Sequence, residues 1–430
     1  MATIIPQRGL VWEEGLLHYE PNWSEETDIS TIRAICRRTL ALPESECQVE
    51  LYSEGGFNKL YKVISAQGTF MMRVALPVDP KHKTLSGIAT MEFARRNSKC
   101  PVPRVVAYDA SADNELGFEW ILMEFIPGKP LYDVWWTIPW STKEKLVKQL
   151  ALYAAQLYAV RFDAIGSLFL GDSAPEDSTL VAQNEVTVIS VSSKVQQSTS
   201  ALFLGRTVDR HFFWHRNIHQ EVHREPFNRI SEWLLARLQL SEIETRRWMA
   251  EEEDDPDLKL GNKILHAIER LRLNLPMVFP NDQVSVCTVV VHSDLSAANI
   301  LVDGEGNLKA VIDWEFSSAV PYWAAVRIPK FINDVDRADK PDEETYAHCE
   351  RVEVTTLYWE HLRHYEETQL RKLWLAEMEQ LEPAWIEAYK IEQTKAGFEA
   401  AVAHCESELS LNKVKTWLDV LERDGEPTHF

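Results

Sequence analysis

The sequence predicts an α+β protein of two lobes, in which a small antiparallel β-sheet lobe is followed by a larger, mainly helical lobe. Short apolar segments separated by glycine turns fill residues 1–125, whereas apolar residues at helical spacing dominate residues 126–430. Between them, Ile126-Pro127-Gly128 interrupts the regular pattern. The charge balance changes at the same point, from −4 in the first part to −17 in the second. We therefore expect an N-terminal lobe over 1–125 and a C-terminal lobe over 126–430.

The first lobe has the pattern of a three-stranded meander, followed by one helix and two further strands. The segments expected as strands are Val49–Ser53, Lys59–Ile64, Thr69–Leu76, Arg104–Tyr108 and Phe118–Phe125. Helical spacing predicts a helix over Ser86–Asn97, and Pro101 prevents its continuation. Because short turns join the first three strands, we expect them to pair antiparallel.

The second lobe opens with an expected helix in which Ser141 and Glu144 have the spacing of a capping box. Residues 172–262 are polar and irregular, and we expect an insert with two or three helices there. A pair of short strands is expected within 285–312, and helical spacing resumes from Glu343 onward. Helices therefore make up most of this lobe.

The composition is typical of a globular protein and excludes several other classes. Hydrophobic residues make up 45% and charged residues 26%, which excludes a mainly disordered chain. The net charge of −21 argues against a nucleic-acid partner. The six cysteines form no Cys-x-x-Cys pair, and no apolar segment is long enough to span a membrane. We recognise neither a signal peptide nor an Arg-rich transit helix, so we expect a cytoplasmic protein with no membrane partner. The sequence does not indicate the oligomeric state.

Three polar residues that follow apolar strands in the second lobe suit phosphoryl transfer. Asp294 and Asn299 belong to a His-x-Asp-x-x-x-x-Asn loop after one strand, and Asp313 follows the strand after that. A hairpin turn at 304–307 can bring them together. Phosphoryl transfer needs one carboxylate to orient the acceptor hydroxyl, and an amide with a second carboxylate to hold Mg²⁺ against the nucleotide phosphates.

The motifs, in this order, resemble those of the aminoglycoside phosphotransferase and choline kinase family, which has a protein-kinase-like fold. The loop from His292 to Asn299 and the segment after it resemble the family's catalytic and metal motifs. Gly55–Asn58 resembles its phosphate-covering loop, Met72–Val74 its third strand, and Met123–Gly128 its adenine-binding hinge. The resemblance covers nearly the whole chain.

The resemblance implies a role for each of these residues. Asp294 would be the catalytic carboxylate, and His292 would support its loop by hydrogen bonding. Asn299 and Asp313 would bind Mg²⁺. The residues that would contact ATP are Gly55 and Gly56 at the phosphates, Arg73 at the α- and β-phosphates, and the backbone of Glu124 and Ile126 at the adenine.

The chain departs from the family pattern where the phosphates are gripped. Arg73 replaces a lysine, although a guanidinium can still bind phosphate bidentately. The family places a glutamate directly after Ser86 to pair with that cation, but this chain has Gly87 there. Glu92 lies five positions further on and so does not share the same helical face. The sequence leaves open whether Gly87 lowers or abolishes activity.

A histidine recurs every four residues in the predicted insert, at His211, His215, His219 and His223. Imidazoles at that spacing could line one helical face and chelate a metal. No carboxylate or cysteine partner is evident, and a surface or core ladder explains the pattern as well.

We expect an ATP- and Mg²⁺-dependent phosphotransferase that acts on a hydroxyl of a small-molecule acceptor, whose identity the sequence does not give. The alternative is a kinase-fold pseudoenzyme that binds a nucleotide or a protein partner without catalysis. Gly87 favours the alternative, whereas the intact catalytic and metal motifs oppose it. A kinase for protein substrates is less favoured because no Ala-Pro-Glu signature follows Asp313.

Overall fold

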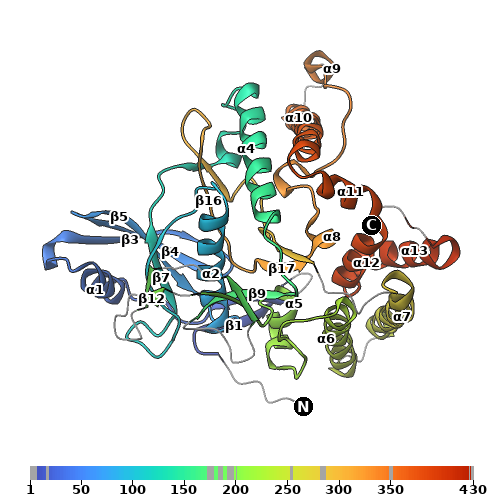
Figure 1. Ribbon diagram of the computed structural model, residues 1–430, viewed down its shortest axis with the longest axis horizontal. Helices are drawn as coiled ribbons and strands as arrows, with labels where there is room; N and C mark the ends of the chain where they lie inside the picture. The colour runs from blue at the N-terminus through green and yellow to red at the C-terminus, as the bar shows by residue number, and fades with distance from the viewer. Residues whose placement is uncertain are drawn as a thin grey trace.

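The chain folds into two lobes, the first built on a sheet and the second mainly helical (Figure 1). The computed structural model describes residues 7–15, 19–171, 179–182, 187–190, 198–199, 201–251, 255–280, 287–347, 352–425 and 427. In Figure 1 the blue first lobe lies on one side, and the orange and red helices of the C-terminal part lie on the other. The two-lobed α+β architecture is therefore confirmed, while the boundary at residue 125 stays a prediction.

The first lobe contains a seven-stranded sheet with the strand order β12-β11-β6-β7-β5-β4-β3. Its strands are β3 (Cys47–Glu54), β4 (Asn58–Ser65), β5 (Gly68–Ala75), β6 (Val105–Asp109), β7 (Trp120–Glu124), β11 (Thr187–Ser190) and β12 (Ser198–Thr199). Strands β3, β4 and β5 pair antiparallel, and β7 lies between β5 and β6. The predicted meander is confirmed, and it places Arg73 on an interior strand of the sheet.

Helix α1 (Ile29–Leu40) packs on this sheet, and the sequence reasoning above did not include it. Asp28 caps the helix, because its carboxylate accepts the backbone N–H groups of Ser30 and Thr31. The buried side chains of the helix join the core under the sheet; they are Ile32, Ile35, Cys36 and Leu40. Two further unexpected strands, β1 (Leu10–Glu14) and β2 (Tyr19–Trp23), form a separate antiparallel pair.

Helix α2 (His82–Asn97) lies between the first sheet and the second lobe (Figure 1). It begins four residues before the predicted helix, so that Lys83 lies in its first turn. Strand β9 (Gly166–Leu170) of the second lobe packs against it. Because protein surrounds the helix, even the side chain of Lys83 is buried.

The second lobe contains a five-stranded sheet with the order β10-β13-β9-β17-β14. The strands not yet given are β10 (Thr179–Ala182), β13 (Leu202–Gly205), β14 (Thr288–Val290) and β17 (Ser318–Pro321). The segment 172–262 does contain helix α6 (Ile230–Glu251) and the start of helix α7 (Asp255–Val278). Its first part, however, supplies β10 and β13 here and β11 and β12 in the first lobe. The two or three helices expected there are present, since α5 (Arg210–Phe213) also lies in this segment, but its strands were not expected; β13 is an apolar strand that pairs with β9.

The long helices α4 (Trp140–Tyr158) and α10 (Val352–Leu381) pack side by side (Figure 1). The expected capping box is absent, because α4 begins directly after Pro139 and no side chain caps it. The remaining helices are η1 (Glu44–Glu46), α3 (Leu131–Val134), α5 (Arg210–Phe213), η3 (His215–His219), α8 (Tyr322–Ala325), η4 (Lys330–Ile332), α9 (Glu343–Ala347), α11 (Pro383–Ile391), α12 (Gln393–His404) and α13 (Glu408–Asp424). The helical character expected after Glu343 is confirmed.

A small three-stranded sheet connects the segment after the hinge to the strands of the catalytic motif. It consists of β8 (Lys129–Pro130), β15 (Ile300–Val302) and β16 (Leu308–Val311), in the order β16-β15-β8. A Cβ atom at Gly128 would lie 3.1 Å from the backbone oxygen of Val302. Glycine therefore permits the close approach of the hinge to β15.

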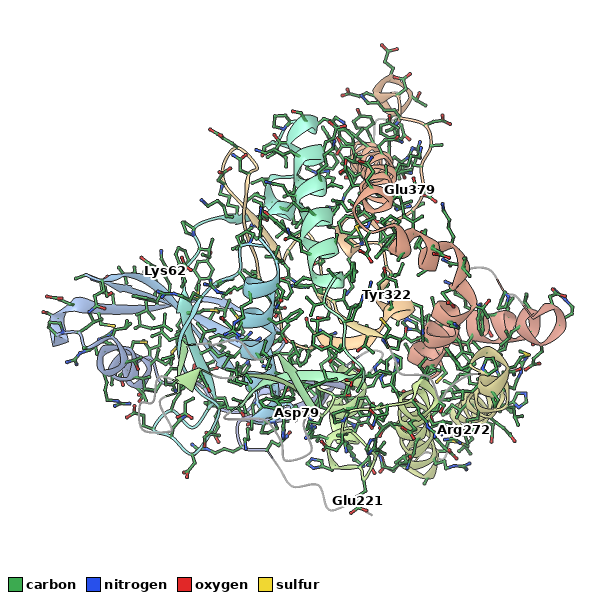
Figure 2. All side chains as sticks on the ribbon, in the orientation of Figure 1. Lys62, Asp79, Glu221, Arg272, Tyr322 and Glu379 are labelled. Atoms are coloured by element: carbon green, nitrogen blue, oxygen red, sulfur yellow. The ribbon has the colours of Figure 1, made fainter. Side chains whose placement is uncertain are left out.

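Ion pairs also join the lobes. The carboxylate of Asp79, at the start of α2, is buried and is 3.2 Å from the Arg206 guanidinium, which follows β13. Figure 2 labels Asp79 at the junction between the two lobes. Among the described helices, none is long and apolar enough to cross a bilayer.

Candidate active site

The loop between β14 and β15 holds Asp294 and Asn299 close together. The Nδ2 group of Asn299 donates hydrogen bonds to the backbone oxygen of Asp294 (2.9 Å) and to its Oδ2 atom (3.1 Å). The other carboxylate oxygen, Oδ1, is 3.0 Å from Nζ of Lys330. The Asp294 side chain is 41% exposed, so a molecule in solution can reach it.

His292 connects this loop to the strand that precedes Asp313. Its Nδ1 atom accepts the backbone N–H of Asp294 (3.1 Å), and its Nε2 atom is 2.9 Å from the backbone oxygen of Ile312. These two contacts require the neutral imidazole with its proton on Nε2. The surrounding protein lowers the pKa of His292 to about 4, which keeps the ring neutral. Ser293 adds a second connection, because its hydroxyl donates to the backbone oxygen of Glu315 (3.0 Å).

Asp313 follows β16 in a strained backbone conformation with φ of +65°. Desolvation by the surrounding protein, together with the carboxylates of Glu315 and Asp294, raises the pKa of its carboxyl group to about 7 against the opposing effect of Arg73 and Lys83. Part of the side chain is nevertheless exposed. The group thus lies where several negative charges converge and where a cation would be stabilised.

Glu315, two residues after Asp313, is buried in a cluster of donors that joins both lobes. Nδ2 of Asn58 lies 3.0 and 3.1 Å from the two carboxylate oxygens. Nζ of Lys83 is 3.4 Å away and Nη1 of Arg73 is 3.7 Å away. Burial alone would raise the pKa of Glu315, but the positive charges of Lys83 and Arg73 lower it, so the group is ionised.

The cluster shows which residue supplies the carboxylate that is missing at Gly87. A Cβ atom at Gly87 would lie 3.3 Å from Nη2 of Arg73, so the helix backbone occupies the side on which the family's glutamate was expected. Glu315 supplies the carboxylate instead. Glu92 is not involved, because it pairs with Arg96 at 3.0 Å on the same helix. Arg73 is therefore oriented by a different residue from the one that the resemblance implies.

Lys83 also fixes the glycine loop. Its Nζ atom donates to the backbone oxygen of Phe57 (3.0 Å) and to Oδ1 of Asn58 (2.9 Å). The ring of Phe57 packs at 5.1 Å against Phe316, which follows Glu315. Gly55 and Gly56 are exposed, and a Cβ atom at Gly56 would meet no atom within 4 Å. The loop expected to cover the phosphates is thus held at its end by Phe57 and Asn58.

The two hinge residues lie at the end of β7 and just beyond it. The backbone N–H of Glu124 donates to the backbone oxygen of Arg104 (2.9 Å), and Ile126 is half-buried. The hinge then runs directly into β8, which pairs with β15 after the catalytic loop. The expected adenine-binding segment and the catalytic loop are therefore parts of one connected framework.

Three charged residues of the site were missed from the sequence: Lys83, Glu315 and Lys330. Lys83 was placed before the predicted helix, although its position one turn before Gly87 could have signalled a contact with Arg73. The position of Glu315, two residues after Asp313, could have indicated that it belongs to the site. Lys330 lies 36 residues after Asp294, at the start of the short helix η4, and no local pattern connects the two.

The histidine repeat does not form a helical face. Helix α5 ends at Phe213, so His211 and His215 belong to different elements. His215 stacks on Tyr19 with ring centroids 4.0 Å apart, and Nδ1 of His211 contacts Asp209 at 2.8 Å. Within the described ranges no group of three or more potential metal ligands of the His, Cys, Asp or Glu type occurs. The repeat is a coincidence of spacing.

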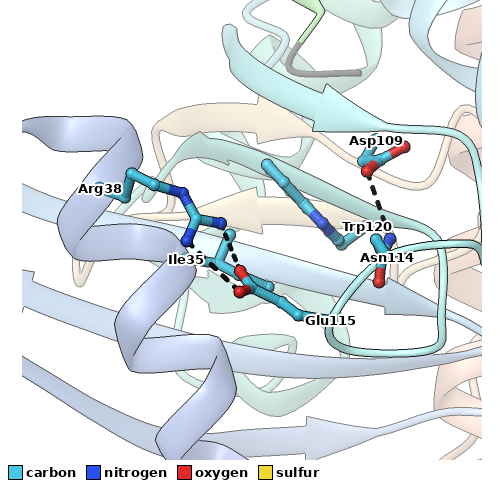
Figure 3. A pocket seen from close by; sticks show the side chains of 6 residues that line it. All are labelled: Ile35, Arg38, Asp109, Asn114, Glu115 and Trp120. Atoms are coloured by element: carbon cyan, nitrogen blue, oxygen red, sulfur yellow. Dashed lines mark hydrogen bonds and ion pairs between the residues drawn. The ribbon is translucent and has the colours of Figure 1, made fainter.

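A cavity of about 290 Å³ lies away from these residues, in the first lobe (Figure 3). Its lining residues are Ile35, Arg38, Asp109, Asn114, Glu115 and Trp120. Their polar groups bind one another: Arg38 pairs with Glu115, and Asn114 donates to Asp109 at 3.3 Å. None of the expected site residues lines this cavity.

The chain matches a family model described as the phosphotransferase enzyme family, over residues 48–324. The match begins at β3 and ends within α8, so it includes both the glycine loop and the catalytic loop. It therefore covers the candidate site except for Lys330.

Curated relatives come from fungi. A subtelomeric hrmA-associated cluster protein of Aspergillus fumigatus is 36% identical over 120 residues, which are 27% of this chain and 24% of that protein. Altered inheritance of mitochondria protein 9, mitochondrial, is 25% identical in Candida glabrata, over 69% of this chain and 54% of that protein. In Saccharomyces cerevisiae the same protein is 22% identical, over 79% of this chain and 60% of that protein. The chain thus spans no more than about three-fifths of these relatives.

The names of the yeast relatives correct the expected location. Both are named as mitochondrial proteins, and each is similar over more than two-thirds of this chain. The cytoplasmic location expected from the sequence was therefore wrong. That expectation had used only the absence of a recognisable leader, which is weak information about a chain that aligns with part of longer relatives.

Solved structures with similar folds are aminoglycoside phosphotransferases at low sequence identity. The ADP-bound structure of aminoglycoside phosphotransferase APH(2'')-Ib is 10% identical, with a TM-score of 0.48 over 94% of this chain and 100% of that one. Aminoglycoside phosphotransferase APH(4)-Ia is 13% identical, with a TM-score of 0.43 over 93% of this chain and 100% of that one. Similarity at this level carries no information about the acceptor.

Proposed function

This chain belongs to the phosphotransferase enzyme family, and from this premise we propose that it transfers the γ-phosphoryl group of ATP to a hydroxyl group of a small molecule. The observation that supports the proposal most is the connected geometry of the two loops. Asn299 binds Asp294, and His292 joins their loop to the strand that ends at Asp313. The carboxylate for the acceptor and the carboxylate for the metal are therefore held in one framework.

We propose Asn299 and Asp313 as the residues that would hold Mg²⁺. The donor set fits a magnesium ion, which prefers a few carboxylate and amide oxygens and takes its other ligands from phosphates and water. The raised pKa of Asp313, caused by burial and by neighbouring carboxylates, also fits a group that functions beside a cation. When bound, Mg·ATP supplies the phosphoryl group and neutralises the charge that develops on it.

Asp294 is the proposed catalytic residue. It orients the acceptor hydroxyl and takes its proton while the hydroxyl oxygen bonds to the γ-phosphorus. The bond from the γ-phosphorus to the bridging oxygen breaks, and its electron pair leaves with ADP. His292 holds the Asp294 loop in place as a neutral, hydrogen-bonded ring.

The proposed nucleotide contacts come from the first lobe. Arg73 would bind the α- and β-phosphates while Glu315 fixes its position. The exposed backbone at Gly55 and Gly56 would cover the phosphates, and the backbone at Glu124 and Ile126 would bind adenine. In the described part of the chain the buried Nε atom of Arg73 has no hydrogen-bond partner, so Glu315 does not use all the donors of this guanidinium.

The experiment compares the full chain with Asp294→Asn in a metabolite extract supplied with Mg²⁺ and ATP. We expect the unaltered protein to produce an ATP-dependent mass increase of one phosphate, and turnover to fall by about 10³-fold or more in the variant. Asp339→Asn, at an exposed position in the same lobe, is the control and should retain activity. Equal turnover in all three proteins would contradict the proposal.

A second candidate function is a nucleotide- or partner-binding protein without catalysis. The observation that favours it is that Arg73 already contacts a carboxylate of its own chain, that of Glu315, two residues after Asp313. Binding of Mg·ATP without any phosphate transfer in the extract would support this candidate.

We also infer a mitochondrial location from the names of the yeast relatives. Fractionation of cells that produce the complete protein tests it. Recovery in the mitochondrial fraction is expected, and recovery in the cytosol alone would contradict it.

A further inference from the structure

Lys330 is the cation nearest to the reacting carboxylate in the described structure. Its Nζ atom is 3.0 Å from Oδ1 of Asp294, while Oδ2 is bound by Asn299. The two oxygens of Asp294 are thus occupied by different partners. Oδ1, the oxygen that faces Lys330, is the one not committed to the structure of the loop.

The position of Lys330 is built by backbone contacts on two sides. The next residue, Phe331, is buried, and its N–H donates to the backbone oxygen of Leu295 in the catalytic loop (3.2 Å). The backbone oxygen of Ile332 accepts a hydrogen bond from Nε of Arg371 in α10 (3.0 Å). The short helix η4 is therefore fixed to both the catalytic loop and the second lobe, while the Lys330 side chain itself is 65% exposed.

The other two cations of the site are committed elsewhere. Arg73 and Lys83 are buried and share the carboxylate of Glu315, and Lys83 also holds the glycine loop. In the part of the chain that the structure describes, Lys330 has neither burial nor a second ion pair that would keep it in place. An exposed pair of this kind adds little to stability. We therefore look for a role of the Lys330–Asp294 pair in phosphoryl transfer rather than in stability.

We propose that Lys330 is a phosphoryl-binding residue that pairs with Asp294 in the free protein and contacts the γ-phosphoryl oxygens when ATP is bound. This inference rests on the proposed function. The flexible four-carbon chain lets the ammonium group turn from Oδ1 to the phosphate oxygens, and that movement frees Oδ1 for the acceptor hydroxyl. A positive charge at this place stabilises the negative charge of the transferring group.

The test measures binding of AMP-PNP and of ADP, each with Mg²⁺, to the full chain by calorimetry. We expect Lys330→Met to weaken AMP-PNP binding about tenfold and ADP binding less than twofold, because only AMP-PNP carries the γ-phosphate. Lys330→Arg keeps the charge and should retain most of the preference for AMP-PNP. In the extract assay, Lys330→Met should also reduce turnover about 100-fold.

Lys390→Met is the matched control, since Lys390 is 67% exposed and pairs with Glu379 at 3.9 Å. It should bind both nucleotides as the unaltered protein does. If Lys330→Met weakens AMP-PNP and ADP equally, or weakens neither, the inference about Lys330 is wrong while the proposed function stands. If the unaltered protein binds neither nucleotide, the proposed function fails and this inference fails with it.

Discussion

The carboxylates of Glu315 and Asp294 both raise the pKa of Asp313, but their own surroundings differ sharply. Glu315 is 3% exposed and is held by Asn58, Lys83 and Arg73. Asp294 is 41% exposed and meets a lysine that is itself in solvent. The buried cluster holds Arg73 and joins the lobes, whereas the open pair can exchange partners. Under the proposed function, Glu315 would therefore position Arg73 and Asp294 would take part in the reaction.

The largest stability effect that this comparison implies is at Glu315. Glu315→Ala would leave two buried cations without their carboxylate, and we expect it to lower the free energy of unfolding by about 3–5 kcal/mol. Denaturant unfolding measures the change. The control is Glu115→Ala, which removes an exposed partner of Arg38 and should cost less than about 1 kcal/mol. Similar losses of unfolding free energy in both variants would show that the buried Glu315 cluster contributes no more to stability than an exposed ion pair.

The next effect concerns the pH dependence of stability. Asp313 has a pKa of about 7 in the folded protein against 3.8 as its ordinary value, so the folded state holds this proton more tightly. Its contribution therefore makes the protein less stable as pH rises from about 4 to about 7, and it is constant above that range. His292, with a pKa of about 4, contributes in the opposite direction below its ordinary value of 6.5.

The contribution of Asp313 to the pH dependence of stability is obtained by comparing the unaltered chain with a variant that lacks the carboxyl group. Unfolding curves of the unaltered chain and of Asp313→Asn are measured from pH 4 to pH 8, and their difference should grow by about 1 kcal/mol in favour of the variant, a modest value because solvent reaches part of the side chain. A difference that stays flat over this range would show that the pKa of Asp313 is not raised by its surroundings.

The smallest effect is expected at Gly87. A methyl group there gains helix propensity of about 1 kcal/mol but approaches the end of the flexible Arg73 side chain at 3.3 Å, so the net change should stay within about 1 kcal/mol. Gly397 is the contrasting helical glycine, because its Cβ atom would lie 2.7 Å from the Trp417 ring, and Gly397→Ala should destabilise by about 1–3 kcal/mol. Thermal unfolding compares the two. A large loss for Gly87→Ala would show that the cluster tolerates no atom at this position.

The parts of the molecule that follow local patterns could be predicted from the sequence. Alternation and short turns predict β3, β4 and β5, and the spacing of His292, Asp294 and Asn299 indicates the catalytic loop. Helix α1 was missed although Asp28 and the apolar residues after it carry the signal. The strands within 179–205 were missed because the polar and irregular sequence of 172–262 favoured an insert of helices, although β10 pairs with β13 and β11 with β12 inside the segment.

The charge pairs of the site could not be predicted in the same way. The pairs of Glu315 with Lys83 and of Asp294 with Lys330 each depend on how separate elements approach in space. The family pattern predicts the carboxylate partner of Arg73 at the position of Gly87. In the structure the carboxylate comes from Glu315 instead. Such exchanges become visible only when the elements are folded together.

The most direct test of the central proposal is a calorimetric titration of AMP-PNP into the full chain, with and without Mg²⁺. We expect binding that depends on Mg²⁺, that is retained in Asp294→Asn and that is weakened at least about tenfold in Asp313→Asn. Binding of equal strength in all three proteins, independent of Mg²⁺, would contradict the assignment of Asp313 to the metal and with it the proposed transfer.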